Sequence, residues 1–185
     1  AEGNLSKGRA FKAHSACISS RTNWDPYSTP CVVYGKGGHG SEKHGNHDAG
    51  QVCIDGYGER LIVDLGSPPG YPLDFFNSNR YAYYNASVKG HNVLTFGDRE
   101  MQGSKFNQAK ILAAEFDEQK GGYWALDLSE LYDGIDSAKR TVVHFFPGIV
   151  VILDQANMKK EDEIVLRWHT AKPSIPNPKG TFIVQ

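Results

Sequence analysis

Short strand-like segments separated by turn signals run through most of this chain, and they constrain its fold more than any other feature. Apolar residues alternate with polar ones, or run together, over five to seven positions at a time, which is typical of β-strands. Turn-forming residues separate them, as at Gly56-Tyr57-Gly58-Glu59, Asp133-Gly134 and Pro147-Gly148. The pattern predicts strands at 51–55, 60–65, 92–96, 110–116, 123–128, 140–146, 149–153 and 164–169.

These segments predict an all-β fold, an antiparallel β-sandwich of large stacked sheets. No long amphipathic helical pattern occurs, and residues 73–86 have the polar and aromatic mixture of a structured loop. At 185 residues and 39% hydrophobic, the chain fits one globular domain over 1–185. Residues 173–179 form a proline-rich connection and 181–185 resemble the start of another strand, so we expect the domain to be truncated at its C-terminal end.

Charge and hydropathy exclude several classes of partner. The net charge is −1 and no basic stripe dominates, so we expect no nucleic-acid partner. No apolar stretch is long enough to cross a bilayer, so we expect no membrane partner. Three cysteines lie in apolar surroundings without metal-type spacing, which favours buried free thiols over one disulfide with a thiol left over.

The stretch from Gly35 to Gly50 is built like no other part of the chain. It contains six glycines and three histidines, with an Asp and a Glu. Histidine titrates near neutral pH and is the commonest side-chain metal ligand, while glycine allows sharp turns. Such a loop adds little to a core, so its composition indicates chemistry or flexibility.

Polar residues at the ends of later strands offer partners for this loop. An Asp and a His at strand ends, facing a histidine-bearing loop, suit zinc, which prefers imidazole and carboxylate ligands. The candidate metal ligands are Asp64 and His91, with His44, His47 or Asn46 completing the shell, and His47 is taken as the third. Taken singly, each also has a purely structural interpretation, because spacing across separate strands is a weak signal.

The order of these elements resembles the heparinase II/III-like polysaccharide lyases. The matching segments are HGNHDAGQVCIDGYGERLIVDLG and RYAYYNASVKGHNVLTFGD, followed by KRTVVHFFPGIVVILDQ and IVLRWHTA. The resemblance implies the C-terminal β-sandwich domain of such an enzyme, without the N-terminal α/α toroid that completes the family's active site. It also implies an acidic polysaccharide substrate, cleaved by β-elimination next to a uronic acid, in a secreted or periplasmic bacterial protein.

The resemblance assigns roles to individual residues. A His of the family motif corresponds to His44, which becomes the first catalytic candidate, as base or as neutraliser of the substrate carboxylate, and Tyr84 is the second. The candidates for substrate contact are Asn46, Tyr71, Arg80 and Tyr81. The family's principal acid/base Tyr belongs to the toroid, so we expect this domain alone to be inactive.

One position departs from the metal-binding members of the family. They carry a zinc-binding His where this chain has Asn46, and Asn is a poor zinc ligand beside imidazole. The cofactor is therefore either zinc or none. Without zinc, Asp64 and His91 are expected to hydrogen-bond each other and hold the loop in place.

Two other classes of function remain open. One is a carbohydrate-binding or scaffold module without catalysis, because half a site is poorly preorganised. The other is a cupin-like metal enzyme, against which the absence of a tight His-x-His followed by Glu argues.

Overall fold

The computed structural model describes residues 5–13, 15–25, 27–42, 44–181 and 184. Within them the regular elements are strands and three short 3₁₀ turns. The strands are β1 Gly8–Ala10, β2 Cys17–Arg21, β3 Val32–Lys36, β4 Val52–Gly56, β5 Glu59–Ile62, β6 Leu94–Phe96, β7 Lys110–Asp117, β8 Gly121–Asp127, β9 Ile135–Phe145, β10 Ile149–Met158 and β11 Ile164–Leu166. The turns are η1 Arg80–Ala82, η2 Val88–Gly90 and η3 Ser129–Leu131.

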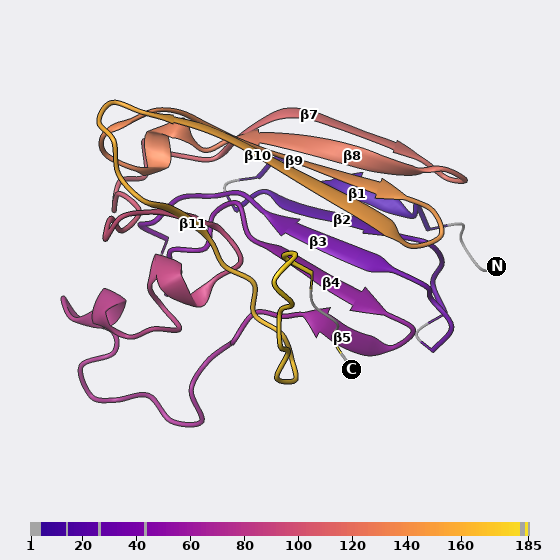
Figure 1. Ribbon diagram of the computed structural model, residues 1–185, viewed down its shortest axis with the longest axis horizontal. Helices are drawn as coiled ribbons and strands as arrows, with labels where there is room; N and C mark the ends of the chain where they lie inside the picture. The colour runs from indigo at the N-terminus through magenta and orange to yellow at the C-terminus, as the bar shows by residue number, and fades with distance from the viewer. Residues whose placement is uncertain (1–4, 14, 26, 43, 182–183, 185) are drawn as a thin grey trace.

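Two antiparallel sheets stack as layers, as Figure 1 shows. Strands β1 to β5 follow one another in a five-stranded sheet, and β7 to β10 do the same in a four-stranded sheet. A third, two-stranded sheet pairs β11 with β6. The fold is therefore the all-β antiparallel sandwich that the strand pattern predicts.

The core lies between the two large sheets. The fully buried side chains that meet there are Ile18, Val33 and Val52 from one sheet and Trp124, Leu126 and Val142 from the other. Gly35 of β3 allows this contact, because a Cβ at that position would lie 2.9 Å from the Trp124 ring. Burying a large apolar side chain of this kind contributes about 1.5–3 kcal/mol.

The predicted strands are found, with shifted ends. Strands β9 and β10 are longer than expected, while β5, β6 and β11 are shorter, because their outer residues turn into the loops of the site. The hairpin between β4 and β5 has the short glycine turn that its sequence predicts, and both Tyr57 and Gly58 have positive φ in it. Of the strand expected at 181–185, residues 182, 183 and 185 lie outside the described residues.

The three cysteines are free, as expected, but only Cys31 is buried. Cys53 is half-buried, and the expected burial of Cys17 is wrong, because its side chain lies on the outer face of β2. Burial raises the pKa of the Cys31 and Cys53 thiols to about 11. Both thiols are therefore inert at neutral pH.

The connectivity brings two long loops to one end of the five-stranded sheet. Because neighbouring strands are antiparallel, β3 ends, β4 begins and β5 ends at the same edge. Residues 37–51 and 63–93 therefore leave the sheet together, and η1 and η2 belong to the second loop (Figure 1). The site is built where these loops meet.

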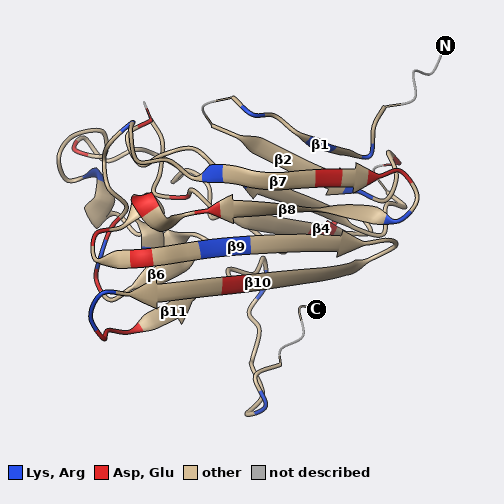
Figure 2. Cartoon of the chain, turned by 90° about the horizontal axis from the view of Figure 1, so that it is seen from above, with Lys and Arg blue, Asp and Glu red and all other residues tan. Residues whose placement is uncertain are grey.

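Charges on the outside of the sandwich are mixed. Figure 2 shows basic and acidic residues interspersed along the strands and loops of the four-stranded sheet rather than gathered by sign. Among the described residues, none belongs to a helix of the length and apolar character needed to cross a bilayer.

Candidate functional site

The glycine- and histidine-rich loop is closed at its base by backbone hydrogen bonds. The N–H of Gly50 donates to the carbonyl of Lys36 over 2.7 Å, and the N–H of Lys36 donates to the carbonyl of Gln51 over 3.1 Å. Gly50 has φ +89°, which an L side chain rarely adopts. The Lys36 ammonium pairs with Asp48 at 2.5 Å across the base, so both ends of the loop are fixed to the sheet.

A buried arginine holds the tip of this loop. Arg80, at the start of η1, is 8% exposed. Its Nε donates to the carbonyl of Gly45 at 3.0 Å, and its Nη2 donates to the carbonyl of His44 and to Oδ1 of Asn46, both at 2.9 Å. Arg80 and Asn46 are both candidates for substrate contact, and in the structure the Arg80 guanidinium hydrogen-bonds Asn46 and the loop backbone.

His44 is presented to solvent by this arrangement. Its side chain is exposed, its φ is +58°, and its carbonyl is the one that Arg80 holds. The imidazole lies 4.8 Å from the Phe76 ring, and Phe76 lies 4.8 Å from Tyr71. Phe76 and Tyr71 are each about half exposed, so His44 stands at the end of an open aromatic row.

His47 faces the interior instead. It is 2% exposed, its Nδ1 lies 2.6 Å from Oε2 of Glu100, and its ring stacks on Tyr81 with centroids 3.5 Å apart. The Tyr81 hydroxyl donates to the carbonyl of Gly40 at 3.0 Å. The backbone N–H of Val88 also donates to Glu100, at 3.0 Å. The stacked pair of His47 and Tyr81 thus joins the two loops on their buried side.

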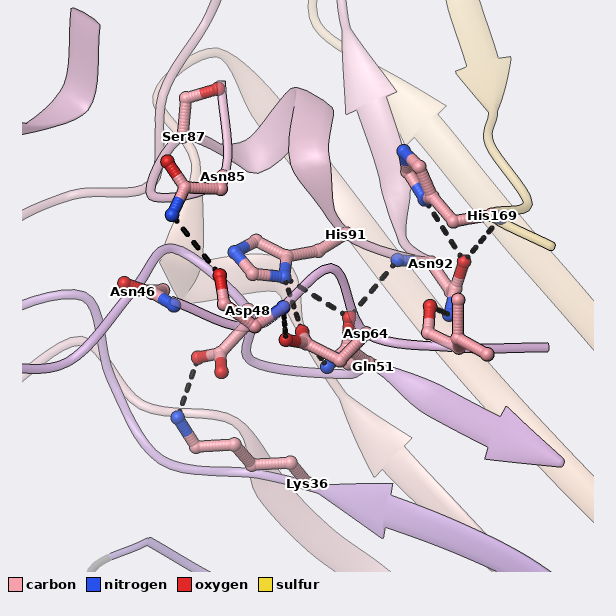
Figure 3. A network of polar contacts seen from close by, with 12 residues as sticks. Lys36, Asn46, Asp48, Gln51, Asp64, Asn85, Ser87, His91, Asn92 and His169 are labelled. Atoms are coloured by element: carbon pink, nitrogen blue, oxygen red, sulfur yellow. Dashed lines mark hydrogen bonds and ion pairs between the residues drawn. The ribbon is translucent and has the colours of Figure 1, made fainter. Parts of the chain in front are cut away.

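Asp64 and His91 form the centre of a polar network, drawn in Figure 3. Oδ2 of Asp64 accepts from Nδ1 of His91 at 2.9 Å and from Nε2 of Gln51 at 2.7 Å. Oδ1 of Asp64 accepts from the N–H of Gly66 at 2.6 Å. His91 is fully buried, and its Nδ1 also lies 3.1 Å from Oε1 of Gln51.

The environment of Asp64 favours its ionised form. Burial by itself raises the pKa of this carboxyl, but hydrogen bonds from His91 and Gln51, the charge of His91 and the Gly66 N–H outweigh it. The pKa of Asp64 is therefore held well below its usual range. The carboxylate contributes stability above about pH 4, and this contribution is lost as the pH falls further.

Zinc does not fit the donor set as it is arranged. Nε2 of His91 and Nε2 of His47 are both buried without a hydrogen-bond partner among the described residues, so the misfit comes from the placement of the side chains and not from a lack of free nitrogens. Within the described part of the chain, no group of three or more His, Cys, Asp or Glu side chains is placed to hold a metal ion. Asp64 and His91 are brought together, and His47 belongs to a different cluster.

Tyr84 belongs to a second series of hydrogen bonds, in which the donor and the acceptor of each bond can be assigned. Nδ2 of the buried Asn92 donates to the carbonyls of Val52 and Val63, both at 2.9 Å, which leaves Oδ1 as an acceptor. Oδ1 accepts from the backbone N–H of His169 at 2.8 Å and lies 3.1 Å from its Nδ1, so Nδ1 carries the proton. The free lone pair of Nε2 then faces the Tyr84 hydroxyl at 3.1 Å.

Burial lowers the pKa of His169, so this imidazole is neutral at pH 7. The half-exposed hydroxyl of Tyr84 therefore donates to a neutral base. Such a pair can take up and release a proton.

Arg140 of β9 ties both loops to the interior of the sandwich. Its Nε and Nη2 make a bidentate pair with Asp154 of β10, each bond 2.8 Å. Its Nη1 donates to the carbonyl of Gly50 at 2.8 Å and to that of Asn92 at 2.6 Å. Arg140 is 0% exposed, so one buried guanidinium connects the base of the histidine loop with the segment that carries His91.

The sequence does not predict the contacts of several of these residues. Glu100 lies 53 positions from His47, and His169 lies 85 positions from Tyr84. Neither pair has a local spacing that could identify it. Phe76 stands in the segment expected to be a loop, where an exposed aromatic ring could have been noticed.

We expect Asp64→Ala to lower the free energy of unfolding by about 2–3 kcal/mol, because it leaves the buried donors of His91 and Gln51 without an acceptor. Urea denaturation measures this. Asp98→Ala is the matched control, since Asp98 is nearly fully exposed and pairs with Lys89.

We also expect the free energy of unfolding of Asp64→Asn to fall less steeply than that of the wild type as the pH is lowered below 4. A dependence on pH equal to that of the wild type would contradict this.

Comparison with known proteins adds to this geometry. The family described as Heparinase II/III-like, C-terminal, matches residues 31–182. A search of curated protein sequences found no significant match.

Solved structures share the fold. A crystal structure of heparinase III superposes with a TM-score of 0.76 at 16% identity, covering 95% of this chain and 27% of that one. Heparan sulfate lyase HepC from Pedobacter heparinus superposes with a TM-score of 0.78 at 15% identity, covering 96% of this chain and 26% of that one. The chain thus spans about a quarter of the length of these proteins. Identities this low support the fold alone, but the family match extends over most of the sequence: the chain belongs to the heparinase II/III-like C-terminal family.

Proposed function

We propose that this chain is the β-sandwich part of a polysaccharide lyase that cleaves a uronate-containing polysaccharide by β-elimination. The observation that carries the proposal is the position of His44. Its imidazole is exposed at the end of an exposed aromatic row, and a buried arginine fixes the backbone of its loop. Structural neighbours described as heparinase III and as a heparan sulfate lyase support the class of substrate.

The reaction needs two kinds of group. The C5 proton of a uronate is weakly acidic, because its removal adds negative charge beside a carboxylate. A cation or a hydrogen-bond donor must stabilise that charge, and a positioned base must take the proton. The bond between C4 and its oxygen then breaks and leaves an unsaturated sugar.

His44 and Tyr84 take the catalytic roles in this proposal. His44 either neutralises the uronate carboxylate as imidazolium or accepts the C5 proton as imidazole. Where His44 is the base, Tyr84 gives its hydroxyl proton to the departing C4 oxygen. Where His44 is the imidazolium, Tyr84 passes its hydroxyl proton to Nε2 of His169, and its oxygen then accepts the C5 proton and delivers it to the C4 oxygen. Tyr71 and Phe76 offer ring faces against which a sugar can pack.

The remaining groups are proposed to come from a helical domain of the same protein. The chain spans about a quarter of its structural neighbours, and His44 is exposed, so this half of the site is open. We propose that the isolated domain is inactive, that the enzyme requires no metal, and that it acts in the bacterial periplasm or outside the cell.

The test is an elimination assay. The longer protein that contains this domain is incubated with heparan sulfate, hyaluronan, alginate and ulvan, and the ultraviolet absorbance of the unsaturated uronate is followed with and without a chelator. We expect absorbance to rise on one polymer and to be unaffected by the chelator, because no three candidate ligands among the described residues are placed to hold a metal ion. A flat trace on all four polymers would overturn the proposal, and loss of signal with chelator would overturn its metal-free form.

A non-catalytic carbohydrate-binding module is the second candidate. The exposed row of Tyr71 and Phe76 favours it, because aromatic faces bind sugars without chemistry. Binding of a polymer without any rise in absorbance would identify this function. The cupin-like alternative loses its basis, since the chain forms two open stacked sheets and belongs to another family.

A further inference from the structure

A hollow of about 730 Å³ opens beside the start of the histidine loop. Its walls come from three connections, those between β1 and β2, between β3 and β4, and between β6 and β7. All three lie at the end of the sandwich from which the histidine loop leaves (Figure 1). The lining includes Ser15, His39, Ser41, Glu42, Lys105 and Phe106. None of these residues belongs to the hydrogen-bond networks of Asp64, Arg80 or Tyr84, so the groups proposed for the reaction leave the hollow without a role.

The hollow lies within one turn of His44. The N–H of Gly45 donates to the carbonyl of Glu42 at 2.8 Å, which closes a turn that contains His44. Arg80 holds the carbonyls of His44 and Gly45 at 2.9 and 3.0 Å, so this turn has a fixed position. A polymer whose reacting sugar lies at His44 therefore has neighbouring sugars within reach of the hollow.

The walls of the hollow are tied together by hydrogen bonds. The N–H of Ala109 donates to the carbonyl of Gly38 at 2.9 Å, which joins the histidine loop to the connection between β6 and β7. His39 is only 9% exposed. Its Nδ1 accepts from the N–H of Ser41 at 3.1 Å and lies 2.9 Å from the Ser41 hydroxyl. The hollow is thus formed before any ligand binds, which lowers the entropic cost of binding.

Two side chains at the hollow take no part in the core between the sheets. Phe106 is 77% exposed and contacts none of the buried apolar cluster. The Lys105 ammonium lies 5.3 Å from the centre of the Phe106 ring and makes no ion pair with any described residue. The acid of the lining, Glu42, faces the Lys36 ammonium, which lies 3.8 Å from its Oε2. The hollow therefore presents an apolar ring face beside a positive charge.

We propose that this hollow binds a further acidic sugar residue of the polymer whose cleavage is proposed above, and that it helps to determine which polymers are cleaved. Phe106 packs against the apolar face of the sugar ring, and Lys105 pairs with its carboxylate or sulfate. The hydroxyls of Ser15 and Ser41 are available to those of the sugar. A neutral sugar would use only the ring, and a simple anion only the charge. The class of polymer rests on the proposed function.

The elimination assay on the longer protein tests this inference with oligosaccharides from the polymer that the protein cleaves. We expect Phe106→Ala to raise KM about tenfold and Lys105→Gln to raise it about threefold, with kcat within about twofold of the wild type. Lys105→Gln should also weaken the increase of KM with salt, because it removes the charge that salt screens.

The matched controls are an exposed ring and an exposed cation at the opposite end of the sandwich. Tyr27, in the connection between β2 and β3, is 86% exposed, and Lys120 stands in the turn between β7 and β8. Tyr27→Ala and Lys120→Gln should leave KM and kcat unchanged. With a sulfated substrate, removal of the sulfates identifies the anion. An effect of Lys105→Gln that persists assigns it to the carboxylate, and one that disappears assigns it to the sulfate.

Wild-type KM in both Phe106→Ala and Lys105→Gln would overturn the inference, while elimination by the wild type would leave the proposed function standing. If the wild type shows no elimination, the proposed function fails, and calorimetry of the same protein with hexasaccharides from the four polymers decides about the hollow. Binding that both variants weaken would then retain it as a sugar site. No binding, or binding that neither variant weakens, would overturn it.

Discussion

Replacing His44 by Ala is expected to lower turnover of the uronate polymer by about 10²- to 10⁴-fold, the usual contribution of a positioned acid or base. The imidazole is exposed and touches the Phe76 ring, while the backbone beneath it is held by Arg80 through a carbonyl that any residue supplies. The free energy of unfolding should therefore fall by no more than about 1–2 kcal/mol, through the strain of Ala at a positive φ. Turnover is measured by the elimination assay, and stability by urea denaturation.

The positive φ of His44 requires a second variant. Ala is strained at φ +58°, whereas Asn tolerates this region nearly as well as His. His44→Asn removes the imidazole and keeps the backbone, so a loss of turnover shared by both variants isolates the chemistry from the strain. Wild-type turnover in His44→Asn would refute the catalytic role.

Replacing Arg140 by Ala is expected to destabilise the protein by about 3–5 kcal/mol, the cost of breaking a buried ion pair on one side. Asp154 would keep a nearly buried carboxylate without its partner, since its side chain is 11% exposed. The carbonyls of Gly50 and Asn92 would lose a donor as well. Urea denaturation measures the effect, and because domains of this size are stable by only about 5–15 kcal/mol, the loss is large.

Two variants control this experiment. Lys139→Ala, one residue earlier on an exposed face of β9, should change stability by less than about 0.5 kcal/mol. The double variant Arg140→Met with Asp154→Leu removes both charges and should recover part of the loss. An Arg140→Ala protein as stable as Lys139→Ala would show that the guanidinium does not hold the two loops.

The fold was predictable where local pattern decides structure. Alternation in β7 to β10 and the glycine turn between β4 and β5 locate these elements, because the side-chain period of a strand and the φ of a turn are local properties. The proximity of Asp64 and His91 was also expected, since both stand at ends of apolar strands, and their direct hydrogen bond was expected for the case without zinc. It forms with Gln51 as a third member.

The partners of the site residues were not predictable in the same way. Arg80 looks like a surface cation in a polar loop, yet it is buried because two phenylalanine rings pack against it and three acceptors reach it from another loop. The contacts of His47 with Glu100 and of Tyr84 with His169 join residues that are far apart in the sequence. These contacts depend on the tertiary arrangement of loops, and the periodicity of apolar residues along the sequence does not predict that arrangement.

Because Arg80 holds the histidine loop through backbone atoms, the fold of the loop does not depend on the side chain that the proposed reaction uses. Arg80 donates to main-chain oxygens of His44 and Gly45, so the loop keeps its shape with any side chain at position 44 that tolerates a φ of +58°, such as Asn. A descendant could exchange that histidine for such a residue in a single step and still fold as before. Retention of this sandwich in a protein is therefore no guarantee of catalysis, and the same tolerance leaves position 44 open to new chemistry.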